Sequence, residues 1–518
     1  MNLLKNTIKY IGLGYLALGM FSCDQGLDLL PPGEVSELIY WQQEKDARLA
    51  VNGIYVELDG PLMVKELDGV TDIGFRAPSG PGSLHDVSMG SFDPVNAAIG
   101  STWDRYFRGV QRANNVLANI DRIEQGNPEL LARYEAEARF LRAYFYTQLS
   151  SLWGDVPLIL EPLEVTAQVG RTSRSEVVDF VIAELDQIIQ GEQLPLSYDQ
   201  DIGRATLGAA MALKARVAYR NERYAVARDA AQAVMDLGIY ELYPNYEELF
   251  HYAGQNSSEV IFDRQYTKGG DTYNAFSFSA ASIGGGSIVE PIHNLFLKYG
   301  YKGPENPDDP FENLDPRWSY TSYYTGQPIG TSTFNSLPDS PTADRVRSTE
   351  FSTVHGYNLK KWVDYDADES NPNTGSINMI LIRYADVLLM YAESKIELNE
   401  IDDSVYEVIN SVRERPTVEM PPITQGKSQA ELRAIIRDER AVELAFEGLR
   451  LFDMNRWGIG EDKIGSVEGL YYFNEESGEW DTINSGLNRN FRPERDYLWP
   501  IPQAEMDIND VITQNPNY

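Results

Sequence analysis

The sequence predicts a mainly α-helical protein in which tetratricopeptide-like helical hairpins form a scaffold and long irregular insertions interrupt it. The clearest hairpin comprises 206–219 and 224–237, where alanines recur at helical spacing on both sides of a short turn. Alanine lets two helices approach closely, and the unit spans about 34 residues, the length of a tetratricopeptide repeat. A second pair of helices is expected at 382–398 and 405–413. Two such pairs favour a repeated helical scaffold.

Further helices are expected before and after these hairpins. Apolar residues recur every three or four positions in three more stretches, 47–58, 103–120 and 134–149. Capping boxes of the form Ser-x-x-Glu begin at Ser173 and Ser428 and start two more helices. The second of these is expected to run to Phe446 and to stop at Gly448.

Residues 253–375 lack helical periodicity and are rich in Gly, Ser, Asn, Asp, Pro and aromatic residues. A stretch of this length without periodicity is either disordered or a functional loop region, and its aromatic residues argue against disorder. The expected layout is therefore a helical scaffold over about 40–250 and 376–460, an irregular part over 253–375, and a C-terminal extension over 461–518.

The composition limits the classes of function. The 518 residues include 44 Lys and Arg against 78 Asp and Glu, and the resulting formal charge of −34 repels phosphate backbones, so no nucleic-acid partner is expected. The single cysteine, Cys23, leaves no disulfide, thiolate zinc site or cysteine nucleophile in the rest of the chain. The 31 tyrosines offer flat apolar faces with a polar tip, which suit sugar rings and protein interfaces, although most aromatic side chains are expected in the core.

A secretory signal is expected before Cys23. Lys5 and Lys9 precede the apolar run 11–21, and a small residue follows it. This run rises only about 16 Å as a helix, roughly half the hydrocarbon core, so it does not predict a spanning helix. The pattern resembles a bacterial lipobox, in which the signal 1–22 is cleaved and the cysteine thiol is acylated, for example with palmitate. An ordinary cleaved signal followed by an incidental cysteine is the alternative.

Several strings resemble the SusD/RagB family of outer-membrane nutrient-binding lipoproteins. In the C-terminal third they are RYADVLLMYAE at 383–393, IRDERAVELAFEGLRLFD at 436–453 with RWG at 456–458, and YLWPIP at 497–502 with TQNPNY at 513–518. NLDPR at 313–317 resembles a further family signature, and Cys23 followed by Leu27, Asp28 and Pro31 resembles the start of the mature lipoproteins. The resemblance thus touches both ends and the middle of the chain.

The resemblance implies a SusD-like domain over 23–518, with an α-helical body of tetratricopeptide-like hairpins and an irregular ligand-binding part. It further implies a protein lipid-anchored to the cell outer membrane and facing the exterior. Such a protein binds a nutrient, in the favoured case an oligosaccharide, and delivers it to a SusC-like TonB-dependent transporter. Peptide or other nutrient binding with the same transporter role, a tetratricopeptide-type adaptor that binds only protein, and a glycan-degrading enzyme are the alternatives.

Two irregular stretches supply the candidate ligand-binding residues, since family members line their ligand site with both. In 66–100 the candidates are Asp72, Phe75, Arg76 and Asn96. In the central part they are Tyr273, Phe276, Tyr323 and Tyr324. Carboxylates and amides hydrogen-bond to vicinal hydroxyls, and rings stack on the apolar face of a pyranose. Plain loop packing is the alternative for each residue, and Trp318 is assigned to the core.

One pair of acids raises the question of catalysis. Glu443 and Glu447 lie one helical turn apart, and paired carboxylates can hydrolyse glycosides. Arg440, Arg450 and Arg456 are spaced to pair with these acids, which would lower the carboxylate pKa values rather than raise one for acid catalysis. We therefore interpret the acids as structural and expect no enzymatic activity.

No cofactor is expected. The four histidines are scattered, without a pattern typical of a transition-metal site. Structural calcium remains an alternative to solvated acids at two clusters, Asp308–Asp309 and Asp364, Asp366 and Asp368.

Overall fold

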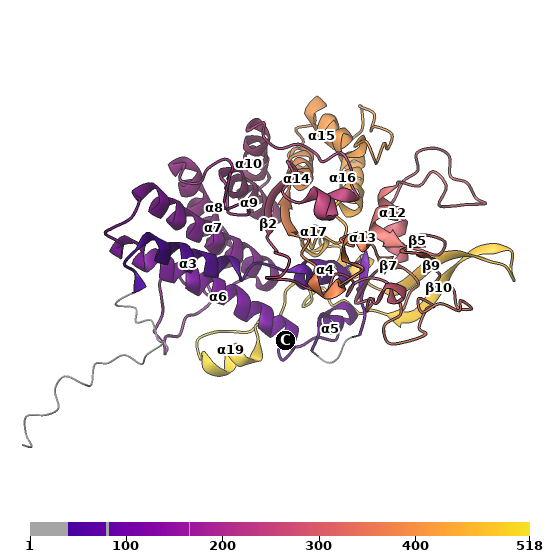
Figure 1. The fold of residues 1–518 in the computed structure, drawn as a ribbon, viewed down its shortest axis with the longest axis horizontal. Coiled ribbons are helices and arrows are strands. Elements are labelled where there is room, and N and C mark those ends of the chain that lie inside the picture. Colours follow the sequence, from indigo (N-terminus) through magenta and orange to yellow (C-terminus); the bar gives the residue numbers. More distant parts are fainter. Residues whose placement is uncertain (1–39, 79–81, 165) are drawn as a thin grey trace, which may run out of the picture.

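The computed structural model describes residues 40–78, 82–164 and 166–518. The predicted signal and the lipidation site Cys23 lie outside these residues. A helical body occupies one side of the molecule, and a part made of loops and short strands occupies the other (Figure 1). Within the described ranges, no helix is both long and apolar enough to span a membrane.

The helical body begins as a row in which successive helices pack on one another. Its members are α3 (Glu44–Tyr55), α6 (Ala97–Asn119), α7 (Pro128–Trp153), α8 (Arg174–Gly191), α9 (Leu207–Arg220) and α10 (Tyr224–Asp236). The stripe of small residues predicted for the α9–α10 hairpin is buried between the two helices, including Ala209, Ala212, Ala227 and Ala231. The first predicted hairpin is therefore confirmed.

Side chains at the helix starts fix where these segments begin. The Asn96 side chain accepts hydrogen bonds from two backbone N–H groups in the first turn of α6. At the start of α8, the predicted capping box is present, because Ser173 and Glu176 satisfy one another's backbone N–H groups.

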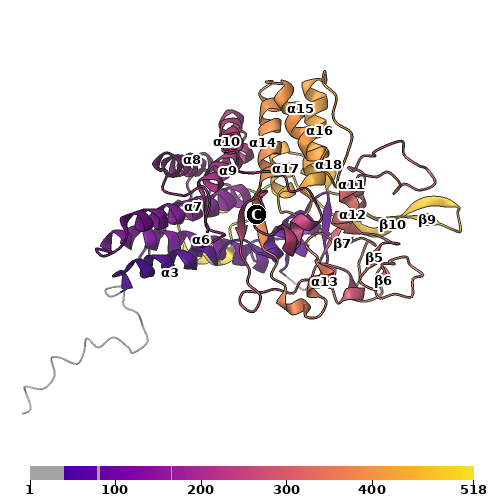
Figure 2. The same cartoon turned by 45° about the horizontal axis from the view of Figure 1, so that its top comes forward.

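The chain leaves this row after α10 and resumes it at α14 (Tyr384–Glu397), which packs directly against α10. Two further helices, α15 (Asp403–Arg413) and α16 (Gln429–Glu443), then pack on α14, so the helices stand side by side (Figure 2). The antiparallel strands β2 (Val260–Arg264) and β8 (Met379–Arg383) pair with each other at the start and the end of the segment that lies between α10 and α14. The second predicted helical pair is thus confirmed.

Helix α16 ends at Glu443, earlier than the expected Phe446. The reason is local backbone geometry: Phe446 and Gly448 have φ values of 59° and 74°, which a right-handed helix cannot contain. The turn leads into α17 (Arg450–Trp457). The Asp68 carboxylate of α4 (Pro61–Gly69) accepts hydrogen bonds from the backbone N–H groups of Glu447 and Gly448 in this turn and of Arg450 at the start of α17.

The irregular part consists of loops, short helices and two-stranded ribbons; the sequence indicates the loops but not the short helices or the ribbons. Its elements are β3 (Val289–Pro291), α11 (His293–Phe296), α12 (Arg317–Thr321), β4 (Ser322–Tyr323), β5 (Pro328–Ile329), β6 (Ser332–Thr333), β7 (Asn358–Leu359) and α13 (Tyr365–Asp368). Antiparallel pairs form between β4 and β7 and between β5 and β6. Strand β1 (Gly74–Arg76) pairs with β3, and α5 (Leu84–Met89) packs on β1, so the N-terminal segment around 61–89 lies with the irregular part.

A second apolar core, separate from that of the helix row, holds the irregular part together. Trp318 is 1% exposed and lies at its centre, in edge-on contact with the rings of Phe296, Tyr299 and Tyr357. This position confirms the assignment of Trp318 to the core.

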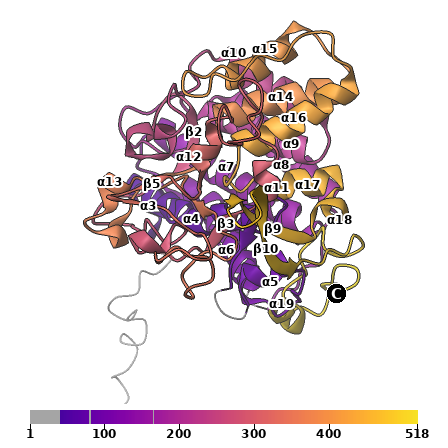
Figure 3. The same ribbon diagram turned by 90° about the vertical axis from the view of Figure 1, so that its right-hand side faces the viewer.

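The C-terminal extension contributes to both halves of the molecule. After α18 (Gly460–Lys463), β9 (Ser466–Asn474) and β10 (Glu479–Asn488) form a hairpin that packs on α11 (Figure 3). The chain then returns through α19 (Gln503–Ile508) to the helix row. There the Trp153 Nε1–H donates to the Pro500 carbonyl at 2.9 Å, and the Trp499 ring contacts the Trp153 ring edge-on.

Candidate functional site

The structure places the charged candidates of 66–100 in the interior. Asp72 is 1% exposed and accepts hydrogen bonds from Nε and Nη2 of Arg450, both at 2.8 Å. Burial works to raise the pKa of Asp72, but the Arg450 charge outweighs it and lowers the pKa. Arg76 is also buried, and its Nε lies 2.7 Å from Oε1 of Glu66. Both charges are therefore neutralised inside the protein.

The other two candidates of this stretch also have structural partners. Phe75 is fully buried and contacts the His355 ring edge-on at 4.6 Å. Asn96 caps α6 and donates to the Ser83 carbonyl at 3.1 Å. In this arrangement, none of the four side chains offers a free surface to a ligand.

The central candidates fall into separate apolar clusters. Phe276 stacks on Tyr365, Tyr323 is buried beside Phe334, and the Tyr273 hydroxyl donates to the Ile377 carbonyl at 3.0 Å. Phe75, Phe276, Tyr323 and Tyr324 belong to four different clusters. The structure therefore does not gather the eight predicted residues into one site.

One of the eight, Tyr324, is half-buried and belongs to a continuous group of rings that reaches the surface. It stacks on Phe311 with ring centroids 4.4 Å apart and planes 7° apart. Phe311 contacts Trp480, and Trp480 contacts Tyr471 at 5.3 Å. Phe473, at the outer end, is 48% exposed. We call Phe311, Tyr324, Tyr471, Phe473 and Trp480 the hairpin aromatic surface.

The β9–β10 hairpin explains why three of these rings share a face. Phe473 lies directly opposite Trp480, and Tyr471 lies opposite Thr482. Because side chains alternate along a strand, residues two apart point the same way, and opposite residues of an antiparallel pair share that face. The inner side of the surface rests on buried Phe296, whose centroid lies 5.5 Å from Phe311 and 5.8 Å from Tyr471. The rings are thus held on a packed support.

Carboxylates lie close to these rings. Burial, together with the nearby charge of Asp309, raises the pKa of Tyr324. Burial and the carboxylate of Glu305 raise the pKa of Tyr301, a neighbour of Tyr471, to about 12. Flat rings beside exposed carboxylates suit a ligand with an apolar face and several hydroxyl groups.

Sequence reasoning missed most of this surface. The aromatic residues of 461–518 fall in the predicted C-terminal extension, although Tyr471-x-Phe473 and Trp480 carry the alternation typical of a strand face. That alternation, with the Ser-Gly turn between, was the available signal for a hairpin. The contribution of Phe311 comes from a distant segment and has no sequence signal.

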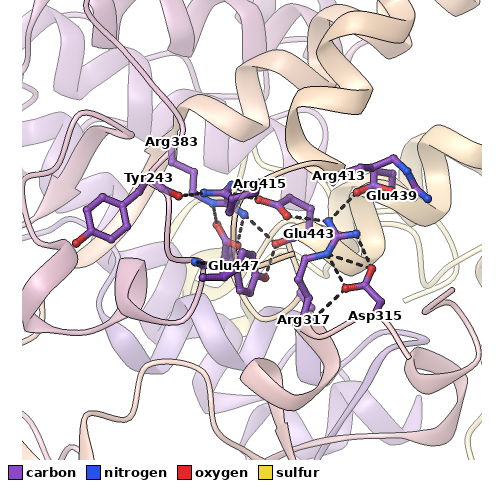
Figure 4. Close-up of polar contacts among 12 residues, drawn as sticks. Tyr243, Asp315, Arg317, Arg383, Arg413, Arg415, Glu439, Glu443 and Glu447 are labelled. Carbon is purple, nitrogen blue, oxygen red and sulfur yellow. Dashed lines mark hydrogen bonds and ion pairs between the residues drawn. The ribbon is translucent and has the colours of Figure 1, made fainter. Parts of the chain in front are cut away.

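Glu443, the last residue of α16, and Glu447, in the turn that follows it, lie in a buried ion network (Figure 4). Arg383 bridges both acids, with Nη1 2.7 Å from Glu443 Oε1 and Nε 2.7 Å from Glu447 Oε2. Glu443 also binds Arg317 and Arg415, at 2.9 and 2.8 Å. Burial works to raise the pKa of Glu443, but the three arginines outweigh it and hold the pKa at about 2. A carboxylate in this state is unsuited to acid catalysis.

The prediction that the acids are tied in ion pairs is confirmed, but the predicted partners are wrong. Arg440 binds Asp386 and Asp453, Arg450 binds Asp72, and Arg456 binds Glu393 and Asp453. Helical spacing suggested these arginines, whereas the actual partners Arg317, Arg383 and Arg415 come from distant segments that tertiary folding brings to α16.

The structure also places the groups considered for metals. Among the described residues, no cluster of three or more His, Cys, Asp or Glu is arranged to hold a metal ion. Asp364 caps α13, and Asp368 accepts a hydrogen bond from the Tyr252 hydroxyl at 2.9 Å. Asp309 accepts the backbone N–H of Phe311 within a turn.

In this protein a row of helical hairpins carries an irregular part, and an aromatic surface on that part reaches the solvent. This arrangement is typical of a binding protein built on a helical scaffold. The model of the SusD family matches residues 252–518, and a second family model, described as "Starch-binding associating with outer membrane", matches residues 83–219. The chain belongs to the SusD family.

Relatives extend the match over the whole chain. A SusD-like protein of Formosa agariphila is 27% identical over 99% of this chain and 98% of its own. A SusD-like protein of Bacteroides ovatus is 26% identical over 81% of each chain. Among solved structures, a SusD-like carbohydrate-binding protein of Bacteroides fragilis is 28% identical, with a TM-score of 0.82 over 92% of this chain and 100% of that chain.

Proposed function

We propose that this protein captures glycans at the cell surface through the hairpin aromatic surface. The observation that carries this proposal is the exposed ring of Phe473 beside the half-buried ring of Trp480, with the two rings held in place by those beneath them. Aromatic faces of this kind stack on the apolar side of sugar rings, and nearby Asp309 and Glu305 supply acceptors for hydroxyl groups. The starch-binding description of the matching family model and the carbohydrate-binding relative support the same ligand class.

The proposed role is delivery rather than cleavage. Glu443 and Glu447 are held by buried cations, and the pKa of Glu443 is held at about 2, which does not suit an acid catalyst. We propose that the captured oligosaccharide passes to a SusC-like TonB-dependent transporter. The family model that associates its members with the outer membrane supports this location. Acylation of Cys23 would anchor the protein there, facing the exterior.

An array carrying both glycans and peptides tests the ligand class. We expect the purified mature protein to bind a set of related glycans and no peptide. Selective peptide binding would contradict the proposal.

Copurification from detergent-solubilised membranes tests the partner. We expect a large outer-membrane barrel protein to be retained with the tagged chain. Its absence under conditions that keep other membrane complexes together would contradict the transporter role.

A further inference from the structure

A cleft of about 370 Å³ lies within the helical body, away from the hairpin aromatic surface. It is formed by the start of α8, the turn between α9 and α10, and α17, whereas the β9–β10 hairpin extends at the right-hand side of the molecule (Figure 1). Four arginines line it: Arg174, Arg220, Arg223 and Arg456. A concentration of guanidinium groups is unexpected in a chain with a formal charge of −34.

Two of these arginines are neutralised and two are not. Arg223 is paired with Asp179, and Arg456 lies 2.8 Å from Glu393. In the described part of the chain, neither Arg174 nor Arg220 forms an ion pair within 4.0 Å. Arg174 instead donates from Nε to the Asn221 side-chain oxygen at 2.8 Å. The cleft therefore contains two positive charges without a partner anion among these residues.

Arg220 is the more telling of the two, because it is only 6% exposed. One of its nitrogens, Nη1, donates to Oε1 of Gln148 at 2.7 Å, and its guanidinium lies over the Phe452 ring at 3.5 Å. Its remaining N–H groups have no partner among the described residues. Burial and the neighbouring Arg216 charge outweigh the carboxylates of Asp386 and Asp453 and lower the pKa of Arg220 to about 9. A buried arginine is usually paired, so Arg220 is suited to bind an external anion.

The surroundings favour an anion further. Two helices of 18 and 13 residues, α8 and α10, begin at the cleft, and their N-terminal ends carry partial positive charge. Helix α10 has no side-chain cap on its first turn. Asn221 and Asn455 add amide groups that can bind hydroxyls. Against these stands one lining carboxylate, the exposed Glu222.

We propose that this cleft is a second binding site, which takes a small ligand carrying a carboxylate or sulfate group, such as an acidic sugar. Arg220 and Arg174 would bind the anionic group as charged hydrogen-bond donors, and the Phe452 ring behind Arg220 holds the guanidinium in place. This proposal does not depend on the hairpin aromatic surface or on the identity of the glycan bound there.

Calorimetric titration at low ionic strength with D-galacturonate, D-galactose and inorganic sulfate tests the site. Binding of galacturonate or sulfate to the full mature protein, with galactose inert, supports it. We expect Glu222→Gln to bind either anion about two- to fivefold more tightly, because it removes the opposing charge. Added sodium chloride should weaken binding. Galactose binding as tightly as galacturonate, or no anion binding by either wild type or E222Q, would overturn the proposal.

A matched pair of substitutions locates the binding without disturbing buried groups. Ser175 is exposed on the cleft wall in the first turn of α8, where an acid is compatible with the helix. Ser175→Glu should weaken anion binding about tenfold or more, whereas Ser175→Gln, of the same size, should leave it within about twofold of wild type. Thermal unfolding checks that both variants fold. Equal anion affinities for S175E and S175Q would place the binding elsewhere and overturn the assignment.

Discussion

Phe473 and Trp480 face each other across the β9–β10 hairpin, with ring centroids 5.8 Å apart and planes at 70°. The edge-on contact leaves Phe473 half exposed while Trp480 is braced by Tyr471 and Phe311. The hairpin thus presents two rings in a fixed relation that a loop alone would not maintain. Rings fixed in advance lose little conformational entropy when a ligand binds.

Glu443→Gln should destabilise the fold strongly. Its carboxylate accepts from Arg317, Arg383 and Arg415, and the amide would leave buried guanidinium groups without their counter-charge. We expect a loss of about 3–5 kcal/mol in the free energy of unfolding, measured by urea denaturation. The control Glu431→Gln changes an exposed capping-box acid, and because glutamine can still accept the Ser428 backbone N–H, the loss should be much smaller. Equal losses for the two variants would show that the network is not the main source of stability.

Acid should unfold the protein within a defined pH range. Burial works to raise the pKa values of Glu443, Glu393 and Asp386, but their arginine partners outweigh it and hold all three at about 2. A carboxylate with a lowered folded-state pKa stabilises the fold above its unfolded pKa and loses that contribution as the pH falls towards the folded value. Stability should therefore fall from about pH 4.5 to about pH 2, by roughly 3 kcal/mol per carboxylate.

The contribution of Asp263 to stability has the opposite pH dependence and acts in a different pH range. Burial raises its pKa to about 6, so its contribution is complete below about pH 4 and is lost as the pH rises through 6. Urea unfolding at several pH values separates the two effects. A free energy of unfolding that stays constant between about pH 4.5 and pH 2.5 would contradict the ion-pair account.

Two helical glycines should respond in opposite ways to alanine. A Cβ on Gly109 of α6 would lie 2.3 Å from the ring of buried Phe145 on α7, so Gly109→Ala should destabilise the fold by about 1–3 kcal/mol. A Cβ on Gly53 of α3 would meet no described atom of another element within 4 Å, so Gly53→Ala should stabilise the fold by about 0.5–1 kcal/mol. Thermal unfolding measures both changes. Stabilisation by G109A would show that α6 and α7 pack less closely than these distances require.

Cys23→Ser tests the proposed anchor. In cells fed labelled palmitate, the wild-type chain should carry label and sediment with membranes, whereas the serine variant should carry none and remain in the soluble fraction. Ser22→Ala, which keeps a small residue before the cysteine, is the control and should behave as wild type. Membrane retention of Cys23→Ser with no labelling of wild type would contradict lipidation at this position.

Local signals predicted the helices well and their long-range partners poorly. The capping boxes at Ser173 and Ser428 and the alanine stripe of α9 and α10 act within a few residues, so the sequence reveals them directly. The partner of Glu443 depends on where 317, 383 and 415 lie after folding. Helical spacing could only offer the arginines nearby, and those bind other acids.

The candidate site shows the same limit. Residue type indicates groups whose chemistry suits a sugar, but burial decides whether such a group is available, and burial is a property of the fold. Asp72 and Arg76 have suitable chemistry and are occupied by Arg450 and Glu66. Tyr324 is the one predicted residue that reaches the hairpin aromatic surface, because its neighbour Phe311 supports it there.

The central claim is tested most directly by the affinity of the double variant Phe473→Ala/Trp480→Ala for the glycan that the wild-type protein binds best on the array. Titration calorimetry should show a loss of at least about tenfold relative to wild type, because the exposed ring of Phe473 and the half-buried ring of Trp480 beside it are both removed. Phe351→Ala, which truncates a similarly exposed ring outside this surface, should retain wild-type affinity. Unchanged glycan affinity in the folded double variant would contradict glycan capture by the hairpin aromatic surface.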